Sequence, residues 1–458
     1  MPLSEHQRLC RSLGLSLPIF QGGMAWASDA ILASAVSREG ALGIIGCGGR
    51  DLPWIKSQIK LTKQLTSSPV ALNFPIGGMS YELIERAILE AINAHIRLFT
   101  VSGSQIYTKL IQRFQPDATI IPLVGTVMQA KLAERSGAKV IICEGQESGG
   151  SVGKSSLFSL LPQVVDSVSL PVVAAGGITD GRGIDAALSL GASGVQLGTR
   201  FLASTECPVD ISYKEKIVKA RDIDTNIVFK RLGRPARVIK NSFCSKYLSM
   251  EEGQTDQETL YSFSLGKLKQ AAEGDVINGA VMAGEGSGMI KEIIPVKEII
   301  NRLQKDSFLI RKPIVFDKKI SEVLDHEPPI LMVDKIVQIK PGEFCEATAK
   351  ISEDLWFFKC HYPDYPIMPG SMLIELMSQV LTLAIKSAPY RAEAAARLVI
   401  SRIDKIRFIR PIYPEMKIVI QAQVVSERHP LILGIVSCTL NDKLICSCEM
   451  TLMSTSPG

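Results

Sequence analysis

The sequence lacks the paired cysteines that mark disulfide frameworks and most metal sites. Its 458 residues contain ten cysteines but no C-x-x-C pair. Cys446 and Cys448 lie two positions apart, a spacing that puts both on one face of a strand. We therefore expect reduced thiols, without a disulfide framework, a zinc site or an iron–sulfur cluster.

Long apolar runs and a strong charge of one sign are also missing. No run reaches the roughly 18 apolar residues of a membrane span, and the first 14 residues lack the apolar core of a signal peptide, so a cytoplasmic protein is expected. Charged residues make up 21% of the chain and leave a formal net charge of +5. This basic density is too low for a nucleic-acid-binding protein, although it suits an acidic macromolecular partner.

The chain does contain many apolar residues, 46% of the total, and its length exceeds one ordinary core, so two domains are expected. In its first 200 residues, eight short apolar runs alternate with amphipathic or Ala/Leu-rich segments long enough for helices. The runs span residues 17–21, 41–46, 69–74, 96–101, 119–124, 139–144, 171–176 and 194–198. Continuous apolar runs are typical of parallel strands buried on both faces, and eight strand–helix repeats predict an α/β fold, a (β/α)₈ TIM barrel.

Glycine and polar residues follow these runs, at the carboxyl ends of the expected strands, which form the active-site face of such a barrel. Gly176 and Gly177 follow the seventh run, and Gly198 and Thr199 follow the eighth. Ligand phosphates commonly bind at these two places through backbone N–H groups. Glycines that only form turns would explain any one of these positions but poorly explain all of them. The pattern therefore predicts a phosphate-bearing cofactor.

Four segments resemble the superfamily of FMN-dependent enoyl-ACP reductases and nitronate monooxygenases. They are QGGMAW (21–26), EGQESGGSVGK (144–154), residues 161–201 and YKEKIVKARDIDT (213–225), within a resemblance that covers about residues 10–300. It implies that residues 1–305 form an FMN-binding barrel with NADH or NADPH as co-substrate. The implied cofactor-binding residues are Gly22, Gly23, Met24, Asn73, Glu144, Gly149, Gly150 and Lys154, with the FMN phosphate at Gly176, Gly177, Gly198 and Thr199.

One catalytic position departs from this superfamily. The family signature reads E-A-G-G-H-x-G, and its histidine contacts the reacting substrate beside the flavin, whereas Ser151 occupies that position here. A hydroxyl is a poor proton donor or base near neutral pH, and losing such a group typically costs ~10²–10⁴ in rate. Either another donor or an ordered water takes part, or the barrel catalyses a different flavin reaction. Of the possible flavin reactions, the hypothesis of nitronate oxidation is weakened most, because that reaction needs a base.

The rest of the first domain is also interpreted through this resemblance. Residues from about 207 to 273 are interpreted as the insertion that covers the flavin in the reductases, and the Gly-rich segment 274–290 as the strip that closes the active site. The sequence then turns charged and reaches Pro313, which predicts a linker over residues 306–315. A second domain is expected over residues 316–458.

In the second domain, strand-like runs alternate with turns around one long apolar segment. Residues 371–388 carry only two charges, Glu375 and Lys386, which predicts a helix buried all round. A carboxyl near the start of such a helix is costly unless it is paired or its pKa is raised. The pattern predicts an α+β fold in which an antiparallel sheet wraps around one helix.

Three motifs of this domain resemble the hotdog-fold 3-hydroxyacyl-ACP dehydratases. They are HEPPILMVD (326–334), the segment 361–379 that begins HYPDYPIMPG, and IRFIRPIYPEM (406–416), within a resemblance that covers about residues 315–455. It implies a dyad of His361 and Glu375 that meets across a dimer interface, hence at least a homodimer, with acyl carrier protein as the substrate-bearing partner. Glu375 points to the glutamate-containing dehydratases, because the dehydratase/isomerases have aspartate there.

Dehydration of a 3-hydroxyacyl thioester requires a base for the Cα proton, an acid for the departing hydroxyl and polarisation of the thioester oxygen. His361 is the expected base, and Glu375, with a pKa raised by its apolar helix, is the expected acid. N–H groups around Gly370, at the helix start, would polarise the carbonyl. Cys360 replaces the glycine usual in the family and is either a small core residue or a nucleophile for thioester hydrolysis. His326 is expected to orient its loop.

Together the two domains predict a bifunctional enzyme of fatty-acid or polyketide synthesis. The hotdog domain would dehydrate a 3-hydroxyacyl-ACP, and the barrel would reduce the resulting trans-2-enoyl-ACP. Fusion would raise the concentration of the intermediate at the second site. Three alternatives stay open. The barrel could be an FMN-dependent dehydrogenase/isomerase or a flavin-binding scaffold with little turnover, or a hotdog thioesterase could be fused to a nitronate monooxygenase-like barrel.

Overall fold

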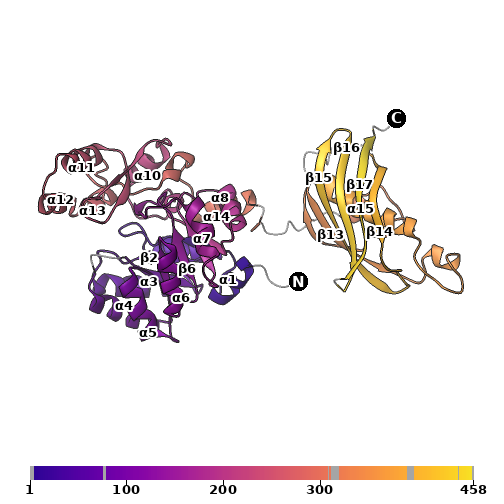
Figure 1. The fold of residues 1–458 in the computed structure, drawn as a ribbon, viewed down its shortest axis with the longest axis horizontal. Coiled ribbons are helices and arrows are strands. Elements are labelled where there is room, and N and C mark those ends of the chain that lie inside the picture. Colours follow the sequence, from indigo (N-terminus) through magenta and orange to yellow (C-terminus); the bar gives the residue numbers. More distant parts are fainter. Residues whose placement is uncertain are drawn as a thin grey trace. The chain divides into compact units, whose positions relative to one another are not determined.

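The computed structural model describes residues 5–75, 79–307, 309–310, 319–388, 397–441 and 443–455. The chain forms two compact units, residues 1–311 and 312–458, each with its own apolar core (Figure 1). The expected linker, residues 306–315, lies for the most part outside the described residues, but Ser307 is buried in the first unit and donates a hydrogen bond to Asp185 at 2.5 Å.

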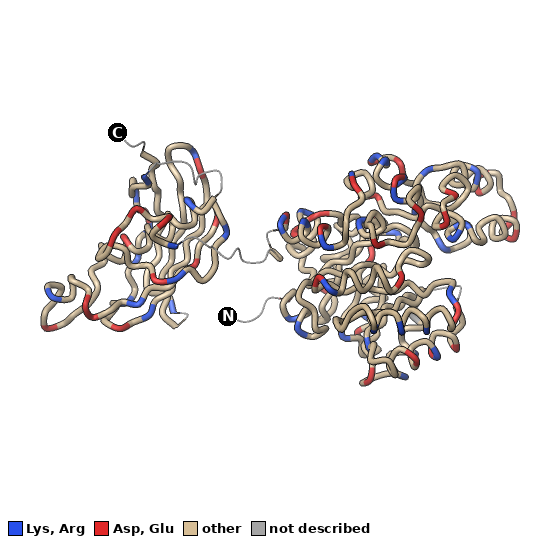
Figure 2. Tube along the Cα trace, turned by 180° about the vertical axis from the view of Figure 1, so that it is seen from behind, with Lys and Arg blue, Asp and Glu red and all other residues tan. Residues whose placement is uncertain are grey.

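Charged residues of both signs are interspersed along the chain in each unit (Figure 2). Over the described ranges, no helix is long and apolar enough to cross a membrane. The same residues contain no group of three or more histidine, cysteine, aspartate or glutamate side chains arranged to hold a metal ion.

An eight-stranded parallel barrel forms the centre of the first unit. Its strands are β1 (Ile19–Gln21), β2 (Gly43–Gly46), β3 (Val70–Phe74), β4 (Leu98–Ser102), β5 (Thr119–Val124), β6 (Ile141–Glu144), β8 (Val172–Ala175) and β9 (Gly194–Leu197). They are ordered β1-β9-β8-β6-β5-β4-β3-β2, and a parallel bridge between Phe20 and Leu42 brings β1 beside β2. These strands fall on the eight apolar runs, and the predicted (β/α)₈ barrel is confirmed.

Helices surround the barrel. They are α1 (Glu5–Leu13), α2 (Ala30–Arg38), α3 (Leu52–Leu65), α4 (Tyr81–Asn93), α5 (Ser104–Phe114), α6 (Val127–Arg135), α7 (Leu157–Val165), α8 (Gly181–Ser189), α9 (Thr199–Leu202) and α14 (Val296–Asp306). The Asp29 carboxylate caps α2 by accepting from the N–H groups of Ile31 and Leu32. Strand residues alternate between an outer apolar layer shared with the helices and an inner layer that includes Phe20 and Ile142.

A lid, which we define as residues 211–272, follows the barrel strands. It consists of α10 (Ile211–Val218), β10 (Thr225–Val228), β11 (Ala236–Ile239), α11 (Ser242–Glu252), α12 (Gln257–Ser264) and α13 (Lys267–Ala272). The short strand β7 (Gly150–Ser151), which follows β6, pairs antiparallel with β11. A separate apolar cluster that includes Phe229, Phe243 and Tyr247 holds the lid together. The lid therefore has its own core and is joined to the barrel by β7.

The second unit is a six-stranded antiparallel sheet packed on one long helix. Its elements are η2 (Ile320–Glu322), β12 (Lys335–Lys340), β13 (Phe344–Ile351), η3 (Trp356–Lys359), α15 (Gly370–Lys386), β14 (Arg397–Phe408), β15 (Met416–Arg428), β16 (Leu431–Leu440) and β17 (Lys443–Thr455). The strand order is β12-β13-β15-β16-β17-β14. α15 contacts β13, β15, β16 and β14 and buries Leu376, Val380 and Leu383. The predicted α+β hotdog fold is confirmed.

Candidate active sites

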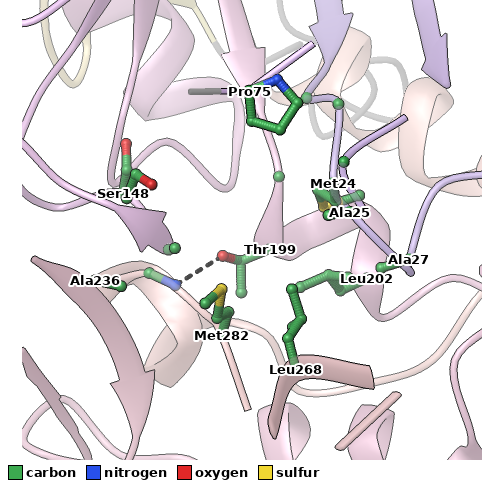
Figure 3. A pocket seen from close by; sticks show the side chains of 18 of the residues that line it. Met24, Ala25, Ala27, Pro75, Ser148, Thr199, Leu202, Ala236, Leu268 and Met282 are labelled. Atoms are coloured by element: carbon green, nitrogen blue, oxygen red, sulfur yellow. Dashed lines mark hydrogen bonds between the residues drawn. The ribbon is translucent and has the colours of Figure 1, made fainter. Parts of the chain in front are cut away.

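A cavity of about 570 Å³ lies at the carboxyl ends of the barrel strands, between the barrel and the lid. Figure 3 shows Met24 and Thr199 of the barrel directed into the same space as Ala236 and Leu268 of the lid. Every residue that the sequence predicted to bind the cofactor lines this cavity except Lys154, and Ser151 lines it too. The fold therefore brings together segments from β1, β3, β6, β8 and β9 that are far apart in the sequence.

The glycines after β8 and β9 leave room for a phosphate group. Gly176 and Gly177 adopt φ values of +119° and +70°, which favour glycine. A Cβ atom built on Gly198 would meet no protein atom nearer than Sδ of Met24 at 3.6 Å, so the space beside it belongs to the cavity. Within the described residues, the N–H groups of Gly177, Gly198 and Thr199 have no hydrogen-bond acceptor. These residues fit an anionic group such as the phosphate of FMN.

Two polar side chains enter the cavity from the strand ends. Asn73, at the end of β3, is buried and donates from Nδ2 to Thr100 Oγ1 at 3.0 Å. Glu144 ends β6, and burial raises the pKa of its carboxyl to about 7, against a smaller opposing effect of a hydrogen bond with Ser148. A carboxyl with such a pKa can hold or release a proton at neutral pH.

Ser151 is held at the cavity by the sheet that joins barrel and lid. Ser151 in β7 is the register partner of Ala236 in β11, and Gly150 is the partner of Arg237. The backbone therefore places residue 151 where a longer side chain could reach a ligand in the cavity. A serine hydroxyl at this position can donate a hydrogen bond but is a poor acid or base at neutral pH.

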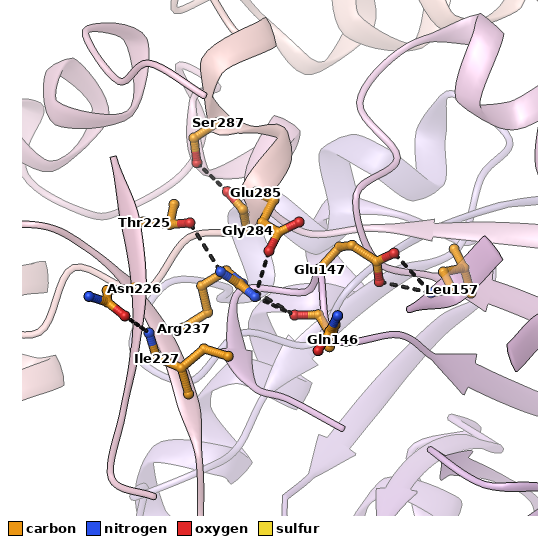
Figure 4. A network of polar contacts seen from close by, with 10 residues as sticks. All are labelled: Gln146, Glu147, Leu157, Thr225, Asn226, Ile227, Arg237, Gly284, Glu285 and Ser287. Atoms are coloured by element: carbon orange, nitrogen blue, oxygen red, sulfur yellow. Dashed lines mark hydrogen bonds and ion pairs between the residues drawn. The ribbon is translucent and has the colours of Figure 1, made fainter. Parts of the chain in front are cut away.

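Arg237 connects three segments around the cavity, a role that the sequence analysis missed (Figure 4). Its guanidinium donates to the Gln146 carbonyl at 3.0 Å and to Thr225 Oγ1 at 3.1 Å. It also lies 2.7 Å from a carboxylate oxygen of Glu285, in η1 (Glu285–Met289) of the Gly-rich strip. The side chain is only 7% exposed. Arg237 thus ties the loop after β6, the lid sheet and the strip together. The only signal in the sequence was an arginine inside an otherwise apolar strand.

In the second unit, His361 follows η3, and two contacts orient its ring. Its Nδ1 lies 3.1 Å from the carbonyl oxygen of Ile367, and the ring stacks on Tyr362 with a centroid distance of 4.4 Å. A carbonyl oxygen only accepts hydrogen bonds, so Nδ1 carries the hydrogen and Nε2 keeps a lone pair. This tautomer suits a general base that acts through Nε2.

Glu375 lies near the start of α15, and its carboxyl has two polar partners, Gln379 and His326. These contacts explain how an apolar helix can carry a carboxyl at this position. Gln379 donates from Nε2 to Glu375 Oε1 at 3.0 Å, and His326 Nε2 lies 3.1 Å from the same oxygen. The Glu375 side chain is 27% exposed. Among the described residues no hydrogen bond or ion pair joins Glu375 to His361 of the same chain. His326, expected only to orient a loop, therefore belongs to the surroundings of the carboxyl.

Gly370 is the first residue of α15, so the backbone places its N–H at the positive end of the helix. Cys360 was expected to be a small core residue or a nucleophile. It is exposed in this chain, with Sγ 3.4 Å from the carbonyl oxygen of Phe357, so the core interpretation is wrong.

Comparisons with known proteins place both units. Residues 6–80 and 80–306 match the nitronate monooxygenase family, and residues 324–449 match the FabA-like domain. A probable nitronate monooxygenase of Staphylococcus saprophyticus is 31% identical over 311 residues, which are 58% of this chain and 87% of that protein. The structure of FabK from Thermotoga maritima is 39% identical in sequence to this chain and matches it with a TM-score of 0.62. The match covers 65% of this chain and 95% of the FabK chain.

A third relative is a dehydrogenase named for a carboxyl-CoA compound. The (3aS,4S,5R,7aS)-5-hydroxy-7a-methyl-1-oxo-octahydro-1H-indene-4-carboxyl-CoA dehydrogenase of Rhodococcus jostii is 34% identical over 233 residues, 50% of this chain and 65% of that protein. The chain therefore belongs to the nitronate monooxygenase family through residues 6–306 and carries a FabA-like domain at residues 324–449.

Proposed function

We propose that the protein catalyses two consecutive steps on an acyl thioester. The hotdog domain dehydrates a 3-hydroxyacyl thioester to a trans-2-enoyl thioester, and the barrel reduces this product with FMN and NADH or NADPH. The observation that carries the proposal is that one chain joins a FabA-like domain to a barrel with 39% sequence identity to FabK. Acyl carrier protein is the proposed bearer of the substrate.

In the dehydration step, His361 Nε2 accepts the Cα proton as the C–H bond breaks. Glu375 donates a proton to the β-hydroxyl as the C–O bond breaks, and the hydroxyl leaves as water. The first N–H groups of α15, around Gly370, lie at the positive end of the helix and would stabilise negative charge on the thioester oxygen. His361 then loses its proton to solvent and Glu375 gains one, which restores both groups.

We further propose that His361 and Glu375 meet across a homodimer. The edge strand β14 supports this, because it exposes apolar side chains that a monomer would leave in water. Val399, Ile400 and Phe408 are 41%, 37% and 51% exposed. An edge strand of this kind offers unpaired N–H and C=O groups to a second copy.

For the barrel, FMN would supply hydride transfer from the nicotinamide to Cβ of the enoyl thioester. Gly176, Gly177, Gly198 and Thr199 would bind its phosphate, and Asn73 would contact its ring system. The Cα atom then needs a proton. Ser151 cannot supply it as readily as an imidazole, whereas Glu144, whose pKa burial raises to about 7, can carry one inside the cavity at neutral pH.

The test of the reductase uses purified protein, a trans-2-enoyl thioester and NADH or NADPH under anaerobic conditions. Oxidation of the nicotinamide with formation of the saturated thioester would support reduction. No oxidation by protein that still holds its flavin would refute it and favour a dehydrogenase/isomerase or an inactive scaffold.

A second candidate for the barrel is nitronate oxidation, which is favoured by the identity to probable nitronate monooxygenases. It requires a base at the substrate carbon, and Ser151 replaces the residue that would serve. Oxygen consumption with a nitronate, in the absence of activity on enoyl thioesters, would establish this alternative.

A further inference from the structure

We propose that His326 is a positioning residue for Glu375: together with Gln379 it holds Oε1 of Glu375, so that Oε2 bears the proton delivered to the substrate. This inference rests on the proposed dehydration. His326 precedes the sheet of the hotdog domain, whereas Glu375 and Gln379 lie on α15. The contact therefore fixes the first segment of the domain against the helix that carries the acid.

Two nitrogen atoms approach the same carboxyl oxygen. Gln379 Nε2 donates to Glu375 Oε1 at 3.0 Å, and His326 Nε2 lies 3.1 Å from that oxygen. Elsewhere in the described part of the chain, Oε2 has no hydrogen-bond or ion-pair partner. The lone pairs of Oε1 are directed at these nitrogens, so the proton of a neutral carboxyl is best placed on Oε2.

The orientation of Gln379 is set by the backbone and is not ambiguous. Its Oε1 accepts the N–H of Met332 at 3.1 Å, and its Nε2 also donates to the Ile330 carbonyl at 2.8 Å. The side chain is fully buried. Gln379 is therefore a fixed donor to Glu375, and His326 approaches from the segment that Gln379 holds in place.

Glu375 is the carboxyl group in contact with His326. The adjacent Asp325 is already ion-paired with Lys386 Nζ at 2.7 Å. The other imidazole nitrogen of His326, Nδ1, is buried and has no hydrogen-bond partner among the described residues. A hydrogen on Nδ1 would be buried without an acceptor, so the arrangement favours the tautomer with its hydrogen on Nε2, directed at Glu375.

This arrangement has a consequence for the reaction. After Oε2 gives its proton to the departing hydroxyl, the carboxylate is stabilised on Oε1 by the donors already in place, without reorganisation. Removing one donor should therefore lower kcat and leave substrate binding largely unchanged. A glutamine at position 326 also carries an N–H donor and should retain much of the stabilisation of Oε1. A phenylalanine keeps an aromatic side chain there but has no nitrogen.

The test measures hydration of a trans-2-enoyl thioester by the full-length protein and its variants. His326→Phe is expected to lower kcat by about 10- to 100-fold, as for loss of a hydrogen bond to a charged group, with KM within about twofold. His326→Gln should recover most of this loss. The control His429→Gln alters an exposed histidine between β15 and β16 and should retain wild-type kcat. Wild-type kcat in His326→Phe, or equal losses in both His326 variants, would overturn the proposal.

A second readout does not depend on activity or on the stability of the His326 variants. The chain has only five histidines, so substituting the other four in turn assigns their imidazole ¹⁵N NMR signals and leaves those of His326 by elimination. Glu375→Gln should shift the His326 signals and leave those of His6, His95 and His429 in place. Unchanged His326 signals would refute the contact. Wild-type protein without hydratase activity would instead refute the proposed dehydration, and with it the positioning role of His326 in that reaction, whatever the NMR contact shows.

Discussion

At the residue scale, Ser151 occupies the position of the histidine in the family signature E-A-G-G-H-x-G. β7 pairs Ser151 with Ala236 of β11, and both residues line the cavity, so a longer side chain at position 151 would lie at its wall. Ser151→His restores the imidazole of the family signature. We expect the rate of enoyl thioester reduction to rise by roughly tenfold or more, because a positioned acid contributes ~10²–10⁴ in rate.

The measurement is anaerobic NADH or NADPH oxidation at saturating enoyl thioester, compared with Ser151→Ala. The alanine variant should differ from wild type by no more than about twofold, since a hydroxyl donates protons poorly at neutral pH. A large loss in Ser151→Ala, with no gain in Ser151→His, would show that the hydroxyl itself is the active group.

Glu144 gives a pH-dependent prediction. Burial raises the pKa of this carboxyl to about 7 in the folded protein, above its ordinary value of 4.5. The folded state then binds the proton more tightly than the unfolded state, so the contribution of Glu144 to stability falls as pH rises from about 5 to 7. Flavin-depleted wild-type protein should lose about 2 kcal/mol of unfolding free energy relative to Glu144→Gln over this range. The measurement is urea unfolding of both proteins between about pH 5 and 7. If the free energy of unfolding changed equally with pH in the two proteins, the prediction would be wrong.

At the element scale, the Arg237 network joins the loop after β6, the lid sheet and the Gly-rich strip around one cavity (Figure 4). Arg237→Met keeps length but removes the guanidinium, which leaves the Gln146 carbonyl and Glu285 without this partner. We expect flavin affinity to fall roughly tenfold, since each lost hydrogen bond of this kind is worth about 1 kcal/mol.

Flavin fluorescence during titration of the depleted protein measures this affinity. Arg113→Met is the matched control, because Arg113 forms an exposed ion pair with Glu85 at 3.1 Å, which contributes little to stability. Equal flavin affinity in wild type and Arg237→Met would mean that the cavity does not depend on this network.

The barrel elements could be predicted because their signal is local. Each strand is a continuous apolar run, and the glycines that follow β8 and β9 mark the phosphate end. The lid helices could not be placed, since their mixed polar residues have no clear period and their core, around Phe243 and Tyr247, is formed by aromatic contacts with the loop at Phe229. Contacts between distant segments, such as Arg237 with Glu285 or His326 with Glu375, leave no pattern in a single sequence.

At the scale of the whole molecule, the two units have separate cores and separate candidate sites. Glu375→Gln should therefore abolish hydration of an enoyl thioester and leave the flavin absorbance spectrum and barrel activity unchanged. Loss of about 10²–10⁴ in hydration rate is expected for removal of the general acid. Full hydratase activity in this variant would show that Glu375 is not the acid, and a changed flavin spectrum would show that the units are not independent.

At this scale we propose that one chain dehydrates and then reduces the same acyl thioester. The most direct test of this proposal supplies a 3-hydroxyacyl thioester and NADH or NADPH to the full-length protein without oxygen, and follows nicotinamide oxidation and the acyl product together. We predict a saturated thioester, formed by wild-type protein but not by Glu375→Gln, which should regain nicotinamide oxidation when trans-2-enoyl thioester is added. Accumulation of the enoyl thioester without nicotinamide oxidation, by protein that retains its flavin, would contradict the proposed sequence of two reactions.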